Sequence, residues 1–271
     1  MSTFRFGVVS GAHGDARLWS ERARRLEGSG YSALLVPDTL FTPSPFLVLA
    51  VTAAATASLH VGTWVLAAPL RSPQATVREA RTLVELSGGR FELGLGAGRP
   101  QAERDAGALG VAWGLGPQRV DQVEATIAAL RDAFGDELHV TLAAGGDRMM
   151  RLAGRHADTV ALPLPPHADV SAVEAAAARV RTATPADRPP IELSLQVAGI
   201  ADAVPAWLRR SAGLTPDSLR EAGAAGYLSG DVARDADALV ALRGSTGVSF
   251  LTVPDELAEQ VTPLVEALAG R

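Results

Sequence analysis

The chain has 271 residues, of which 47% are hydrophobic, and this is enough to bury a full core in one large domain. A formal net charge of −5 and a sequence pI near 5.6 argue against a nucleic-acid partner, and no run of basic residues opposes this. The absence of cysteine excludes disulfides, cysteine-ligated metals and thiol nucleophiles.

The N-terminal residues enter a strand-like run and lack the basic and apolar regions of a secretory signal. The most apolar window, residues 46–57, is too short to span a bilayer. We therefore expect a cytoplasmic protein that has no membrane partner and acts on a small molecule.

Short apolar runs alternate with helical patterns along the whole chain. Eight runs predict strands, at residues 4–9, 33–36, 60–67, 90–95, 138–143, 159–162, 191–197 and 248–253. Eight stretches predict helices, at residues 15–27, 45–57, 73–86, 120–134, 148–156, 170–181, 235–242 and 256–269. Strands separated by helices are parallel, and eight such units at this length predict a single α/β domain over residues 1–271, a (β/α)8 TIM barrel.

The active sites of such barrels lie at the carboxyl ends of the strands. His13 follows the first predicted strand and Asp38 follows the second, so both fall on the active face. His60 and His139 stand where strands begin, on the opposite face, and we expect them to be structural.

Residues 86–98 read LSGGRFELGLGAG, which predicts a helix end, a short strand and a glycine-rich turn. Glycines at positions 94, 96 and 98 permit close approach of the backbone to a bulky group such as a cofactor. They also partly match the dinucleotide fingerprint of doubly wound sheets, but Arg99 follows and no helix opens there. No metal-ligand cluster and no Gly-x-Ser-x-Gly motif occur, so neither a metal site nor a serine hydrolase is expected.

The glycine-rich block, VPD at residues 36–38, VGTWVL at residues 61–66 and AGG at residues 144–146 together resemble the bacterial luciferase-like monooxygenases. Within that family the similarity is to the subgroup of deazaflavin (coenzyme F420)-dependent oxidoreductases. The resemblance covers most of the chain and implies a luciferase-like barrel and a homodimer, to which the apolar helix at residues 46–57 would contribute.

The resemblance also implies a cofactor site at the active face. A non-proline cis peptide bond at Trp64–Val65 would lie against the cofactor ring, and Asp38 would contact the ring or its polyol chain. Backbone N–H groups after the AGG turn would bind the phosphate, with Arg148 adding charge. The cofactor-binding residues implied in this way are Asp38, Trp64, Val65, Gly96, Ala97, Gly98, Ala144, Gly145, Gly146 and Arg148.

Three functions remain open on this basis. The first is hydride transfer from reduced F420 to a small organic substrate, with Asp38, Glu103 or His13 as the catalytic proton source. The second is an FMN-dependent monooxygenase, which needs a site sheltered from water. The third is a cofactor-free barrel that has lost redox activity and works as a different enzyme or as a binding protein.

The chain departs from the family pattern at several positions. Thr39 stands where many members carry histidine, and Arg99 stands where an aromatic residue is common. The insertion that members usually carry after the fourth helix, between residues 134 and 143, is shortened. We expect this shortening to leave the cofactor pocket more open, which disfavours oxygen chemistry.

Overall fold

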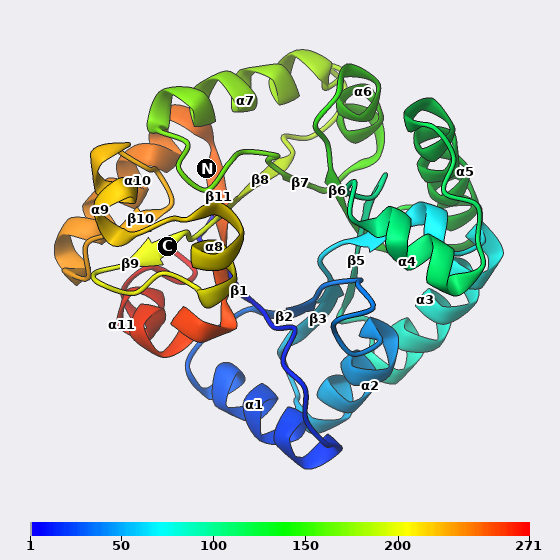
Figure 1. The fold of residues 1–271 in the computed structure, drawn as a ribbon, viewed down its shortest axis with the longest axis horizontal. Helices are drawn as coiled ribbons and strands as arrows, with labels where there is room; N and C mark the ends of the chain where they lie inside the picture. The colour runs from blue at the N-terminus through cyan, green and yellow to red at the C-terminus, as the bar shows by residue number, and fades with distance from the viewer. Residues whose placement is uncertain (1) are drawn as a thin grey trace.

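A closed parallel barrel is formed by residues 2–271, the part of the chain that this computed structural model describes (Figure 1). Its strands are β1 Arg5–Val9, β2 Ala33–Val36, β3 His60–Thr63, β4 Leu66–Ala67, β5 Phe91–Gly96, β6 His139–Ala143, β7 Thr159–Ala161, β8 Glu192–Gln196 and β11 Val248–Pro254. They are ordered β3-β2-β1-β11-β8-β7-β6-β5-β4, and pairing of β3 with β5 closes the barrel. Because β3 and β4 are two halves of one interrupted strand, the barrel has 8 strand positions, and the predicted (β/α)8 fold is confirmed.

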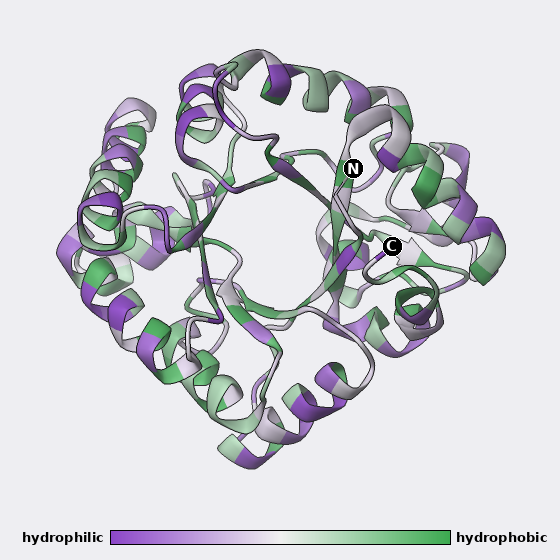
Figure 2. Cartoon of the chain, turned by 180° about the vertical axis from the view of Figure 1, so that it is seen from behind, coloured by the Kyte–Doolittle hydropathy of each residue, from purple (hydrophilic) through white to green (hydrophobic). Residues whose placement is uncertain are grey.

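Helices surround the barrel on all sides (Figure 1). They are α1 Ala16–Gly28, α2 Pro45–Ala55, α3 Pro73–Ser87, α4 Ala102–Leu109, α5 Gly116–Phe134, α6 Asp147–His156, α7 Val170–Ala183, α10 Val232–Thr246 and α11 Ala258–Leu268. Short 3-10 turns, η1 Ala68–Leu70 and η2 Asp255–Leu257, follow β4 and β11. Figure 2 shows hydrophilic stretches recurring along these outer helices. The main hydrophobic core lies between them and the strands, and it includes Val8, Leu34 and Leu264.

Local sequence signals explain where several helices begin and end. Asp15 caps α1 by accepting a hydrogen bond from the Leu18 N–H at 2.9 Å, and Ser72 caps α3 through the Ala75 N–H at 3.2 Å. Gly88 ends α3 in the left-handed conformation, with φ 63°, as the glycine-rich block predicted. Among residues 2–271, no helix is both long and apolar enough to cross a bilayer.

The segment between β8 and α10 contains four elements that the sequence patterns did not predict. They are β9 Gly199–Ile200, α8 Ala206–Ala212, α9 Pro216–Glu221 and β10 Tyr227–Leu228. Leu208, Leu214 and Leu219 form a small core of their own beneath them. Strands of 2 residues and helices of 6 or 7 are shorter than one readable hydrophobic period, which is why they were missed.

One connected polar network fills the N-terminal end of the barrel, and six strands contribute to it: Arg5, His60, Glu92, His139, Thr159 and Glu192. Arg5 pairs with Glu92 and lies 3.1 Å from Glu192, and the His60 Nδ1 lies 2.9 Å from Glu92. Thr159 donates to Glu192 at 2.7 Å and lies 2.8 Å from the His139 Nε2. Both histidines therefore make structural contacts at the barrel end where the sequence placed them.

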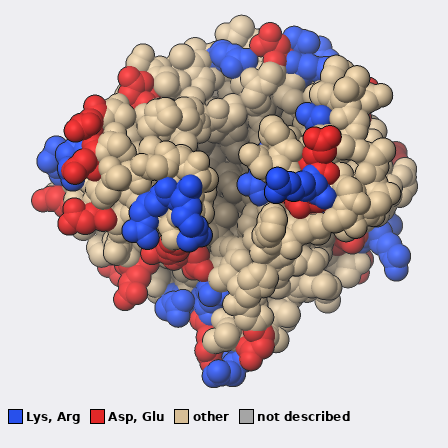
Figure 3. Space-filling model, in the orientation of Figure 1, with Lys and Arg blue, Asp and Glu red and all other residues tan. Residues whose placement is uncertain are grey.

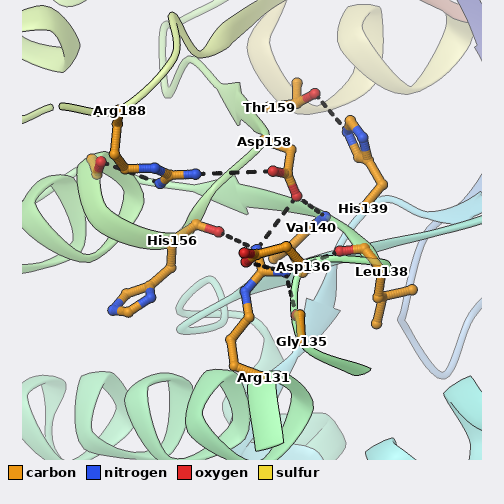
Figure 4. Close-up of polar contacts among 11 residues, drawn as sticks. Arg131, Gly135, Asp136, Leu138, His139, Val140, His156, Asp158, Thr159 and Arg188 are labelled. Carbon is orange, nitrogen blue, oxygen red and sulfur yellow. Dashed lines mark hydrogen bonds and ion pairs between the residues drawn. The ribbon is translucent and has the colours of Figure 1, made fainter. Parts of the chain in front are cut away.

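The connection between α5 and β6 lies at this same N-terminal end, beside a cavity of about 480 Å³. Figure 4 shows the polar contacts around it. Arg131 organises it by donating to the carbonyls of Gly135 at 3.0 Å, Leu138 at 3.2 Å and His156 at 2.6 Å. Only residues 135–138 connect α5 to β6, so the connection is short as predicted. It lies away from the carboxyl ends of the strands. The expectation that it opens the cofactor pocket is wrong, because helix-to-strand connections occupy the opposite face of a barrel.

Candidate functional site

A cavity of about 780 Å³ opens at the carboxyl ends of the strands. Its lining comes from the ends of β2, β5, β6 and β7, from the interruption between β3 and β4, and from the first turns of α5 and α6. Figure 3 shows the hollow mouth of the barrel, with basic side chains over α8 on one side and over the α4 region on the other. The volume lies within the range of about 300–1,000 Å³ that is typical of small-molecule sites.

The inner wall of the cavity is formed where β3 stops and β4 begins. The Trp64–Val65 peptide bond is cis, which confirms the prediction made from the family resemblance. Trp64 and Val65 are half-buried and line the cavity, and the Trp64 ring meets Phe250 edge-on with centroids 5.8 Å apart. The wall is therefore apolar, and the aromatic contact fixes its shape.

The glycines of β5 are explained by this interruption in the neighbouring strand. A Cβ at Gly94 would lie 2.1 Å from the Thr63 carbonyl oxygen, and one at Gly96 would lie 3.1 Å from the Val65 Cγ2. The backbone of Thr63 therefore occupies the space that a side chain at position 94 would need. The sequence had suggested that a cofactor approaches Gly94, and this expectation is wrong. Gly96, Ala97 and Gly98, which were predicted to contact a cofactor, do line the cavity.

Asp38 lines the cavity, but other residues already bind its carboxylate. Arg71 donates to it twice, at 2.6 and 3.0 Å, and the Ala67 N–H donates at 3.0 Å. The carboxylate in turn raises the pKa of Arg71, although burial alone would lower it. This pairing fixes η1 and β4 to the end of β2 and leaves Asp38 ill-suited as the free proton source that the sequence suggested.

The far end of the cavity is formed by the N-terminus of α6. Gly145 and Gly146 line it, and Ala144 is fully buried beneath them. Gly146 is the N-cap, no side chain caps the helix, and a Cβ on Gly146 would meet no atom within 4 Å. The first backbone N–H groups of α6 thus have no side-chain cap and begin at the cavity, an arrangement that suits a phosphate.

The charged side chains of that first turn are mostly neutralised. Arg148 lies 2.6 Å from Asp121 and 2.6 Å from Glu124, and these carboxylates raise its pKa. Asp147 lies 3.0 Å from Arg179. Arg148 therefore lines the cavity as predicted, but its charge is already balanced by residues of α5.

Two other arginines line the cavity and lack a carboxylate partner among residues 2–271: Arg99 and Arg119. Arg119 was not predicted as a site residue, because the hydrophobic pattern placed the start of the helix at residue 120, whereas α5 begins at Gly116. A Pro at the second position of α5 was the available signal for the earlier start.

The structure does not bring Glu103 or His13 to the cavity. Glu103 is exposed on the first turn of α4, where Ala102 is the residue that lines the cavity. His13 is exposed, and its Nε2 lies 3.0 Å from the Phe41 carbonyl oxygen. Thr39 does line the cavity, with its hydroxyl 3.1 Å from that of Thr42. Residues 2–271 contain no group of three or more His, Asp or Glu side chains arranged to hold a metal ion.

A family model for luciferase-like monooxygenases matches residues 1–139, which include β1 to β5 and the wall at Trp64–Val65. The chain belongs to this family. Members of the luciferase-like family are F420- or flavin-dependent oxidoreductases or monooxygenases. No curated protein matches the sequence.

Solved structures of this fold resemble the chain along nearly its whole length. The coenzyme F420-dependent tetrahydromethanopterin reductase from Methanopyrus kandleri is 14% identical with a TM-score of 0.74, over 98% of this chain and 99% of that chain. An F420-dependent secondary alcohol dehydrogenase in complex with an F420–acetone adduct is 13% identical with a TM-score of 0.77, over 98% and 99%. The oxygenating constituent of 3,6-diketocamphane monooxygenase from Pseudomonas putida, in complex with FMN, is 14% identical with a TM-score of 0.71, over 98% and 96%. At these identities the likeness shows the fold alone.

Proposed function

We propose that this luciferase-like protein is an oxidoreductase that uses reduced coenzyme F420 for hydride transfer to a small organic substrate. The observation that carries the proposal is the combination, in one cavity, of an apolar wall at Trp64–Val65 with the uncapped N-terminus of α6. A flat ring needs the first and a phosphate needs the second.

The residues present fit such a ligand. Trp64 and Val65 would support one face of the ring, and Gly146 and the first turn of α6 would bind the phosphate. Asp38, held by Arg71, fixes the Ala67 backbone beside the wall. When bound, F420 supplies a hydride from its ring carbon. The lining carboxylates Asp38 and Asp147 are both paired with arginine, so solvent at the open mouth would be the proton source.

FMN is the alternative cofactor, and an FMN-dependent monooxygenase the alternative reaction. The charge of the cavity favours F420, because Arg99 and Arg119 add positive charge to the same cavity. FMN ends at its phosphate, whereas F420 continues into an anionic tail. The open mouth also offers little shelter from water, which oxygen chemistry needs (Figure 3).

The proposal is tested by titrating the purified protein with oxidised and reduced F420 and with FMN, followed by cofactor fluorescence. We expect micromolar binding of F420, weaker binding of FMN, and loss of F420 binding in Asp38→Ala. Arg155→Gln, on the opposite face of the barrel, serves as the matched control and leaves the Kd unchanged. Tighter binding of FMN would support the monooxygenase. Binding of neither would support a barrel without a cofactor.

We also propose that the protein is a homodimer in which the outer face of α2 packs on a second copy. Leu47 on α2 is 71% exposed and Leu86 at the end of the adjacent α3 is 60% exposed. The sequence of α2 is apolar on all sides, which is typical of a helix that is buried all round. The cytoplasmic location expected from the sequence remains a prediction.

A further inference from the structure

Arg119, in the first turn of α5, is held in a defined position at the edge of the cavity. Its Nε donates to the Ala97 carbonyl at 3.2 Å, and its Nη1 donates to the Gly114 carbonyl at 3.0 Å. Its guanidinium carbon lies 4.6 Å from the centre of the Trp113 ring, a cation–π contact. Three contacts therefore restrain a side chain that ordinarily has many rotamers.

Trp113 is itself held against the glycine-rich turn. Gly98 has φ 77°, and a Cβ there would lie 2.4 Å from the Trp113 Cη2. Glycine is therefore required at position 98 both by the left-handed backbone and by the indole ring. The last glycine of the block thus helps to place Arg119.

The contacts with Ala97 and Gly114 tie two loops together, and that structural role uses only part of the guanidinium. Arginine has five N–H donors, and the Nη2 of Arg119 has no acceptor among residues 2–271. None of the carboxylates that the structure describes lies within ion-pair distance of it. A restrained, partly buried arginine without an anion is suited to bind one.

The position of Arg119 relative to α6 indicates which part of a ligand would supply that anion. The two helices meet at their first turns, where the Arg148 Nη1 donates to the Pro117 carbonyl at 3.4 Å. The N-terminus of α6 and Arg119 therefore line one continuous cavity, with Arg99 beside Ala97 and Gly98 on the same wall. A ligand whose phosphate lies on α6 would place its next anionic group near Arg119 and Arg99.

We propose that Arg119, assisted by Arg99, binds a carboxylate that the ligand carries beyond its phosphate, and that this contact selects F420 over FMN. F420 bears carboxylates on the tail that follows its phosphate, and FMN ends at the phosphate. The inference rests on the proposed function and names the residues that determine cofactor specificity.

The test compares three ligands by fluorescence titration: F420, the same deazaflavin 5′-phosphate without the tail, and FMN. Wild-type protein is expected to bind F420 about tenfold to hundredfold more tightly than the tail-less phosphate, the usual effect of a charge-assisted hydrogen bond. Arg119→Gln is expected to remove most of that difference and to change the Kd of the tail-less phosphate less than threefold. Arg104→Gln, an exposed arginine on α4 that does not line the cavity, is the matched control.

The outcomes separate this inference from the proposed function. Equal binding of F420 and the tail-less phosphate by wild-type protein overturns the inference and leaves the proposed function standing, and this comparison needs no variant. An equal loss of both ligands in Arg119→Gln also overturns it, since the residue then acts on the phosphate or on the fold. Binding of no deazaflavin to wild-type protein overturns both.

Discussion

The clearest quantitative prediction concerns Glu92, the most buried carboxylate of the network at the N-terminal end of the barrel. Burial alone would raise its pKa, but the His60 hydrogen bond and the charge of Arg5 lower it to about 2, from an ordinary value of 4.5. Each pKa unit corresponds to about 1.4 kcal/mol, so the ionised Glu92 stabilises the fold by roughly 3 kcal/mol.

Because this pKa is lower in the folded state, the contribution is fully present above about pH 4.5. It is lost as the pH falls toward about 2, where the folded carboxylate takes up its proton. Glu92→Gln removes the charge at every pH. We expect it to lower the free energy of unfolding by about 3 kcal/mol at pH 7, because the half-buried Arg5 loses one of its two carboxylate partners.

The assay is urea unfolding of wild type and Glu92→Gln between pH 7 and pH 2.5, read by far-ultraviolet circular dichroism. The difference in unfolding free energy between the two proteins should shrink as the pH falls below 4.5. Glu21→Gln is the control, since Glu21 is exposed and forms a surface pair with Arg17, and the substitution should cost less than about 1 kcal/mol. If the wild-type and Glu92→Gln stabilities fall in parallel with pH, the electrostatic account of this network is refuted.

Two further predictions concern the cavity wall and the dimer. In urea unfolding at pH 7, Gly94→Ala should destabilise the fold by more than about 2 kcal/mol, because its Cβ would meet the Thr63 carbonyl. Gly107→Ala, in open space on α4, should instead stabilise the fold by up to about 1 kcal/mol in the same experiment. Leu47→Glu should convert a dimer to a monomer in sedimentation-velocity experiments, and an unchanged sedimentation coefficient in a dimeric wild type would show that α2 is not the interface.

Much of the fold was predictable because it depends on local patterns. The strand at residues 33–36 matches β2, and the helix at residues 73–86 matches α3 to within one residue. Short apolar runs and period-3.6 hydrophobic patterns, together with signals such as Gly88, mark these elements directly in the chain. Their strict alternation then limits the topology to a parallel barrel.

Part of the site was also predictable, but through family resemblance. The cis bond at Trp64–Val65 and the turn at Gly145–Gly146 were placed correctly on the cavity. Arg119 was not predicted to line the cavity, because the four residues of the first turn of α5 were assigned to a loop. A boundary error of one helical turn was enough to hide a residue of the cavity.

The state of the charged residues was decided by tertiary structure alone. Asp38 pairs with Arg71 across 33 positions of the sequence, and Arg148 pairs with Glu124 across 24. Glu103, by contrast, follows a lining residue but lies on the exposed side of its helix. The sequence by itself determined which elements form and which loops meet at the active face. Which charges remain free there depends on contacts between distant segments, and those exist only once the barrel has closed.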